Sequence, residues 1–247
     1  EWAGVTKGAG RGGAKDNLKL SIEAFDELKE QNISVEVLQQ LTGFDDLTVP
    51  QQLHLTNIIT SQTPIDHLGA LLPNLLKLRL SHSTVPTFRD LGTRLKNLQV
   101  LWMPRCQVSD LSGVFGLPSL EELYLAFNDI EYLDDLAMHE RLQVLDLEAN
   151  RVGDQGELTH LGSCSKLTTL TLAGCPVVGG TEREYRKKVV KMVPTLEFLD
   201  DEAVCALDVE GPSQQQAGPY SPEAQAPKVG GGLDDMYFGG CDAGLHT

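Results

Sequence analysis

The sequence has little positive charge, few aromatic residues and no long hydrophobic run. Its 247 residues include 35 Asp and Glu but only 20 Lys and Arg, which gives a formal net charge of −15. Such a surface repels phosphate backbones, so the composition argues against a nucleic-acid partner. No segment approaches the length of a membrane-spanning helix, and we expect no membrane insertion. The 41% of hydrophobic residues is still enough to bury a sizeable core.

Cysteines and catalytic motifs are also scarce. The five cysteines are an odd number and form no CxxC pair, which predicts reduced thiols in an intracellular protein. No HExxH, GxSxG or P-loop sequence occurs, and the six histidines are scattered. We therefore expect no enzyme activity, no cofactor and no metal site.

An internal repeat is the main feature that is present. Five segments begin at residues 75, 98, 120, 142 and 167, so their starts lie 23, 22, 22 and 25 residues apart. The clearest copy is LEELYLAFNDI, and all five fit the pattern LxxLxLxxNxL with substitutions. This pattern is the leucine-rich repeat. A weaker copy, with Leu53 and Leu55, is expected to precede these five.

One repeat cannot bury its apolar face alone, but stacked repeats form a continuous core. The sequence therefore predicts an α/β fold, a leucine-rich-repeat solenoid with short parallel strands on its concave face and a helical cap at each end. The asparagine position of the pattern must satisfy buried backbone groups at a bend. It holds Ser83, Cys106, Asn128, Asn150 and Cys175.

Both ends of such a solenoid need caps. Two short helices are expected upstream, the second with Ser34 as N-cap and Gly43 as stop. Downstream, Thr181 and Glu184 predict a capping box, and Pro194 predicts the end of that helix. We expect the following organisation: flexible basic arm 1–15, N-terminal helical cap 16–45, repeats 46–178, C-terminal cap 179–204, and acidic, Pro/Gly-rich tail 205–247.

The tail lacks the apolar periodicity that a core needs. Its one apolar cluster is Met236, Tyr237 and Phe238, in the sequence DDMYFGG. This cluster is either an anchor that a partner holds or part of a plain linker, and the sequence leaves both possibilities open.

Side chains between the inward leucines point to the concave face, because strand side chains alternate. Aligned repeats bring Trp102 beside Tyr124, with Phe127 at the edge, two arginines on one side and two acids on the other. Aromatic and arginine residues are frequent interface hot spots, so we expect a partner-binding surface rather than incidental surface aromatics. Its members are Arg79, Trp102, Arg105, Tyr124, Phe127, Asp146 and Glu148.

Residues 45–203 resemble the leucine-rich repeat-containing protein 56 family. The resemblance lies in LPNLLKLRLSHSTVPTFRDLGTRLKNLQVLW, LPSLEELYLAFNDIEYLDDL and LQVLDLEANRV, and the phrase from Phe88 to Trp102 is the most specific. The sequence departs from the repeat pattern at Ser83 and Cys106, which replace the asparagine.

The resemblance implies a non-enzymatic adaptor in motile cilia, found on the axoneme and in the cytoplasm. Its role would be the assembly, transport or docking of outer dynein arms. The implied partners are outer-arm dynein or its docking and accessory proteins, and the intraflagellar transport machinery. Two other functions remain open. The repeat class and its C-terminal cap resemble those of a regulatory subunit of protein phosphatase 1, which suggests a phosphatase regulatory subunit, and the other is a tubulin-cofactor-like binding protein.

Overall fold

A computed structural model describes residues 33–137 and 139–209 of the chain. All described residues belong to one compact unit. The first of the two expected upstream helices, the basic arm and the apolar cluster of the tail fall outside the described residues.

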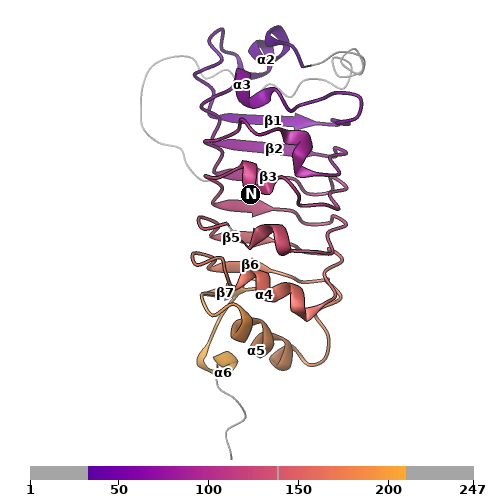
Figure 1. Ribbon diagram of the computed structural model, residues 1–247, viewed down its shortest axis with the longest axis vertical. Helices are drawn as coiled ribbons and strands as arrows, with labels where there is room; N and C mark the ends of the chain where they lie inside the picture. Colours follow the sequence, from indigo (N-terminus) through magenta and orange to yellow (C-terminus); the bar gives the residue numbers. More distant parts are fainter. Residues whose placement is uncertain (1–32, 138, 210–247) are drawn as a thin grey trace, which may run out of the picture. The chain divides into compact units, whose positions relative to one another are not determined.

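One sheet of eight strands runs through the described unit, with the strands in sequence order (Figure 1). Neighbouring strands from β1 to β7 are parallel, and only β7 and β8 pair antiparallel. The strands are β1 Gln52–Thr56, β2 Lys77–Ser81, β3 Val100–Trp102, β4 Glu122–Tyr124, β5 Val144–Asp146, β6 Thr169–Thr171, β7 Phe198–Leu199 and β8 Glu202–Ala203.

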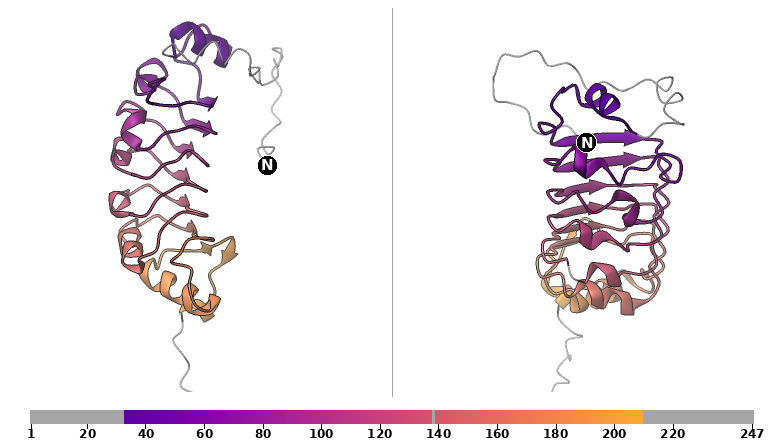
Figure 2. Two further views of the ribbon diagram at one scale, coloured as in Figure 1. Left: turned by 90° about the vertical axis from the view of Figure 1, so that its right-hand side faces the viewer. Right: turned by 45° about the horizontal axis from the view of Figure 1, so that its top comes forward.

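Short helices connect the strands on the opposite side from the sheet. Figure 2 shows the strands along the inner side of an arc and the helical turns along its outer side. These turns are α3 Leu68–Leu71, η2 Phe88–Leu91, η3 Val114–Gly116, η4 Asp134–Leu136, η5 Gln155–Glu157 and α4 Leu158–Leu161. The predicted fold class, a leucine-rich-repeat solenoid with strands on the concave face, is confirmed.

The core lies between the sheet and the outer turns. Two inward side chains in or just after each strand from β1 to β6 fill it, as in Leu78 and Leu80 of β2, or Leu123 of β4 and Leu125 just after it, and each of these four is at most 1% exposed. Burying one such side chain stabilises the fold by about 1.5–3 kcal/mol. Phe88, on the outer side, is the largest fully buried side chain among the described residues, and no feature of the repeat pattern predicts it.

The asparagine position satisfies buried backbone groups, as expected. The side-chain oxygen of Asn128 accepts from the backbone N–H groups of Cys106 (2.9 Å) and Val108 (3.0 Å). Its amide donates to the carbonyls of Met103 and Leu125, at 2.8 Å each. The Asn128 side chain therefore joins its own turn to the preceding repeat.

Substitutes at this position keep part of that bonding. The Ser83 hydroxyl accepts from the N–H of Ile58 at 3.1 Å, and the Cys175 thiol donates to the Leu147 carbonyl at 3.1 Å. The earliest repeat, whose asparagine position the sequence does not reveal, has Ile58 there. Ile58 is 5% exposed and packs in the core instead.

Helical caps close the described ends. Helix α2, Val35–Thr42, begins at Ser34, whose hydroxyl accepts from Val37 N, and ends at Gly43 in the left-handed region. Helix α5, Glu182–Met192, has the predicted capping box of Thr181 and Glu184. Its last residue lies two positions before Pro194, as the proline predicts.

The chain remains folded beyond the point where the acidic tail was expected to begin. Residues Ala206–Val209 form helix α6, and the buried Arg186 of α5 holds it by donating to both carboxylate oxygens of Asp208, at 3.2 Å each. Arg186 also donates to the carbonyls of Leu199 and Ala203. Sequence periodicity cannot reveal these contacts, because they occur once rather than in every repeat.

Candidate functional site

The strand register lines up side chains from successive repeats on the concave face. Arg79 pairs with Trp102, Trp102 with Tyr124, and Tyr124 with Asp146. We call these four residues the concave column. Its alignment was predicted from the repeats and is confirmed, because one leucine pattern sets both the inward and the outward positions of every strand.

An aromatic pair occupies the middle of the concave column. The rings of Trp102 and Tyr124 stack with centroids 4.1 Å apart and planes 13° from parallel. The guanidinium of Arg79 lies 5.6 Å from the Trp102 ring centroid, within the range of cation–π attraction. Both aromatic side chains are half-buried, so each leaves apolar surface on the concave face.

A second pair lies in the turns that follow β3 and β4. The guanidinium of Arg105 is 4.3 Å from the centroid of the Phe127 ring, and Phe127 is 43% exposed. A hydrogen bond from Arg105 N to Ala126 O (3.1 Å) joins the two turns and places the two residues side by side, and Phe127 N bonds in the same way to Glu148 O of the next turn (2.7 Å). The turn itself therefore presents this arginine and this aromatic ring together.

These turns have an unusual backbone. In all five clear repeats the residue just before the asparagine position takes the left-handed conformation, which costs a side-chain-bearing residue about 1–2 kcal/mol relative to glycine. Only the last of the five uses glycine. The residues are His82 (φ 52), Arg105 (φ 56), Phe127 (φ 59), Ala149 (φ 52) and Gly174 (φ 77).

Acidic side chains flank the aromatic pair on the β5 side. Burial, together with the nearby charge of Asp201, raises the pKa of Asp146, although its carboxylate accepts a hydrogen bond from Glu148 N at 2.9 Å. The Tyr124 hydroxyl donates to Glu122 Oε2 at 2.9 Å. Burial and this carboxylate raise the pKa of Tyr124, so its hydroxyl stays protonated and remains a donor.

Seven residues were predicted for the partner-binding surface, and the structure places all of them on the sheet's concave face or in the adjoining turns. Their role in binding stays a prediction. The predicted tail anchor of Met236, Tyr237 and Phe238 lies outside the described residues.

Two further residues of this face lie outside the seven predicted for the partner-binding surface, although strand alternation already puts the first of them, Glu122, on the face. Glu122 lies on the same strand as Tyr124, two positions away, which puts both on one face. Phe198 pairs with Thr169 in the β6–β7 ladder and is 44% exposed. The spacing of Phe198 from Leu196 and Leu199 carried the signal for its outward position.

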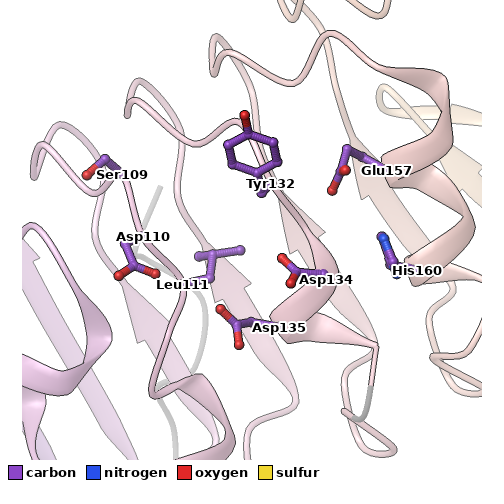
Figure 3. A pocket seen from close by; sticks show the side chains of 8 residues that line it. All are labelled: Ser109, Asp110, Leu111, Tyr132, Asp134, Asp135, Glu157 and His160. Atoms are coloured by element: carbon purple, nitrogen blue, oxygen red, sulfur yellow. The ribbon is translucent and has the colours of Figure 1, made fainter.

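A separate depression of about 590 Å³ lies among the loops and outer turns that follow the strands (Figure 3). Its carboxylates partly serve the fold, since Glu157 accepts from Leu133 N at 2.8 Å and Asp110 accepts from Ser112 N at 2.7 Å. No group of His, Cys, Asp or Glu within the described ranges is arranged to hold a metal ion. The lining residues are Ser109, Asp110, Leu111, Tyr132, Asp134, Asp135, Glu157 and His160.

Three of the four described cysteines are structural rather than nucleophilic. Cys106, Cys164 and Cys175 are buried free thiols, whereas Cys205 is exposed. Burial raises the pKa of the Cys106 thiol to about 11, and it raises the pKa values of Cys164 and Cys175 as well. Because the thiolate is the nucleophile, these three groups are unreactive at neutral pH in the folded chain.

Comparison with known proteins gives the same repeat class. Residues 96–137 match the family model described as Leucine Rich repeats (2 copies). A solved leucine-rich repeat protein of Leptospira interrogans superposes with a TM-score of 0.51 at 20% identity, covering 74% of this chain and 46% of that one, which supports the fold alone. No helix in the described part of the chain is both long enough and apolar enough to cross a membrane.

Two human relatives are similar in sequence. Leucine-rich repeat-containing protein 56 is 40% identical over 186 residues, which cover 71% of this chain and 34% of that protein. Cilia- and flagella-associated protein 410 is 35% identical over 98 residues, or 40% of this chain and 38% of that protein. The chain spans about a third of the length of the first of these relatives.

Leucine-rich repeat proteins are generally non-enzymatic scaffolds for protein interaction, and the stacked repeats of this chain support the role of a protein-interaction scaffold. Its repeat region belongs to the leucine-rich repeat-containing protein 56 family.

Proposed function

We propose that this chain is a non-enzymatic adaptor in motile cilia that binds a protein partner on its concave face. It takes part in the assembly, transport or docking of outer dynein arms. The aromatic pair is the observation that supports partner binding on the concave face. Trp102 and Tyr124 are stacked and only half-buried, although the neighbouring inward leucines already fill the core.

Large aromatic and arginine side chains contribute most to protein interfaces when a partner removes them from water. The concave face supplies both kinds of residue, in Arg79 beside Trp102 and in Arg105 over Phe127. The ciliary half of the proposal rests on similarity to leucine-rich repeat-containing protein 56 and to cilia- and flagella-associated protein 410.

The proposal is tested by purifying the tagged chain from ciliated cells and identifying the proteins that accompany it. We expect outer-arm dynein, its docking proteins or intraflagellar transport components. The double variant Trp102→Ala/Tyr124→Ala should lose them by tenfold or more while its melting curve stays cooperative. Recovery of a phosphatase catalytic subunit or tubulin in place of ciliary proteins would favour one of the other two functions.

A matched control removes two exposed aromatic rings from the outer side. Phe115 is 68% exposed and Tyr132 is 60% exposed, so Phe115→Ala/Tyr132→Ala deletes similar apolar surface away from the concave column. We expect this variant to retain the partners. If both double variants behave alike, the concave face is not the interface.

A further inference from the structure

The concave column has a charge order as well as an aromatic centre. From β2 to β5 it presents a cation, Arg79, then the aromatic pair, then an anion, Asp146. Lys77 and Arg105 add positive charge at the β2–β3 end, and Glu148 adds negative charge at the β5 end. The face is therefore polarised along the stacking direction of the strands.

These charges are not neutralised within the described part of the chain. Its ion pairs are Arg151 with Asp129, His67 with Asp66, and Arg186 with Glu202 and Asp208. None of them involves a charged residue of the polarised face.

The two charged ends also do little to neutralise each other. Arg79 and Asp146 lie three strand spacings apart, which is about 14 Å. This separation exceeds the screening length of about 8 Å at physiological salt. Each end is thus available to a charged group of opposite sign.

The acidic end of the face gains the most electrostatic stabilisation from a charged group of opposite sign. Asp146 is half-buried, and burial and the charge of Asp201 raise its pKa, so its ionised form destabilises the folded chain. A cation placed there would reduce this destabilisation, and it would also meet the Tyr124 ring, where cation–π attraction adds to the ion pair.

We infer that the concave face binds a polypeptide segment of complementary polarity. An acidic side chain of this segment lies against Arg79, an apolar side chain covers Trp102 and Tyr124, and an Arg or Lys lies against Asp146 and Glu148. The inference rests on the proposed use of the concave face and specifies the chemistry of its partner. The 14 Å span corresponds to about nine residues of α-helix or four of extended chain.

Segments of a single charge fit less well. A wholly acidic segment would be repelled at Asp146 and Glu148, and a wholly basic one would be repelled at Lys77, Arg79 and Arg105. A nucleic acid presents only negative charge and faces the same repulsion at the β5 end.

The test selects peptides from a random library of 16-residue sequences displayed on phage, using the full chain as bait. Wild-type protein should enrich peptides with an acid and a base separated by apolar residues. Arg79→Glu should enrich peptides that are basic at both ends, and Asp146→Arg should enrich peptides that are acidic at both ends. A synthetic peptide selected on wild type should bind either variant at least tenfold more weakly.

Matched charge reversals provide the control. Lys96 and Glu140 are exposed and lie four residues before β3 and β5, at equivalent positions of their repeats. Lys96→Glu and Glu140→Arg make the same charge changes outside the concave column. Both should enrich the same peptides as wild type, and thermal melting should show that all four variants are folded.

Several results would overturn the inference. These are enrichment of no peptide, enrichment without a charge order, or the same peptides from wild type and the column variants. A wild-type dimer in sedimentation equilibrium that Trp102→Ala/Tyr124→Ala dissociates would instead assign the face to a second copy of the chain. If ciliary proteins co-purify but peptides show no charge order, only the partner chemistry is wrong. If ordered peptides are selected but no ciliary protein is recovered, the ciliary assignment fails.

Discussion

At the scale of single residues, the asparagine position shows how a side chain can replace missing backbone partners. Asn128 is 6% exposed and makes hydrogen bonds to two N–H groups and two carbonyls from two repeats. Asn150 repeats the arrangement one turn later, accepting from Ile130 N and donating to the carbonyls of Leu125 and Leu147. These polar groups would otherwise be buried without partners.

We expect Asn128→Ala to lower the free energy of unfolding by about 3 kcal/mol, because it leaves several buried backbone groups unsatisfied. The neighbouring substitution Asp129→Ala is the control. Asp129 pairs with Arg151 at 2.7 Å, but both side chains are substantially exposed, so its loss should cost at most about 1 kcal/mol. Urea denaturation of the three proteins measures both effects, and equal losses would contradict the assigned role of Asn128.

Asp146 predicts a pH dependence of stability. Its pKa is raised in the folded chain, so the charged form lowers stability at neutral pH. This cost disappears as the pH falls below the ordinary aspartate pKa of about 4, where the carboxyl is neutral in both folded and unfolded chains.

Asp146→Asn should therefore be more stable than wild type at pH 7, and the difference should shrink towards zero near pH 3.5. Asn can keep the hydrogen bond that Glu148 N donates. Thermal melts from pH 3.5 to 7.5 measure the trend, with Asp45→Asn in the N-terminal cap as the matched control. A variant less stable than wild type at pH 7 would mean that burial does not dominate at this carboxylate.

At the scale of structural elements, the residue in the left-handed position of each turn affects stability and binding differently. Phe127 pays the conformational cost of this backbone and remains 43% exposed, whereas the equivalent Gly174 avoids the cost. Relief of strain in Phe127→Gly opposes both the greater freedom of the unfolded chain and the lost contact with Arg105.

We expect Phe127→Gly to change the free energy of unfolding by less than about 1 kcal/mol and to weaken partner binding severalfold. Ala149→Gly, at the same position of the next repeat, should change stability similarly and leave binding intact. Denaturation and titration with a selected peptide measure the two effects. A Phe127→Gly variant that binds as wild type would remove Phe127 from the surface.

The repeating elements were predictable from the sequence because each position recurs. The 22-residue period sets the strand register, and the register places Trp102 beside Tyr124 without further information. Contacts that occur once could not be predicted, because no second copy reveals them. Examples are helix α6, held by Arg186, and Asp200, which accepts from Leu172 N and Ala173 N beyond the last repeat.

The same distinction applies to the concave face. Its columns follow from alternation along the strands, but the 4.1 Å stacking and the bond from Tyr124 to Glu122 depend on side-chain conformations that no spacing encodes. The raised pKa of Asp146 comes mainly from burial and in smaller part from the charge of Asp201, which belongs to the cap rather than to a repeat.

At the scale of the described unit, each repeat contacts mainly its neighbours, so damage should stay local. Leu38 of α2 is fully buried against the first repeats, and Leu38→Ala should destabilise that end by about 2–5 kcal/mol through a cavity. Hydrogen exchange should quicken in β1 and β2 and remain unchanged in β5 and β6. Leu145→Ala, within β5, should instead raise the exchange rates around β5 and β6. If both variants raise the exchange rates uniformly along the sheet, the unit unfolds as one cooperative whole.

The buried thiols have a practical consequence for following such openings. Cys106, Cys164 and Cys175 are distributed along the solenoid, and each becomes alkylated only when its own repeat opens. Cys205 is exposed and supplies the rate of the unprotected reaction in the same tube. The alkylation rate of each buried thiol thus reports how often one of three repeats opens, and mass spectrometry can measure these rates without any engineered label.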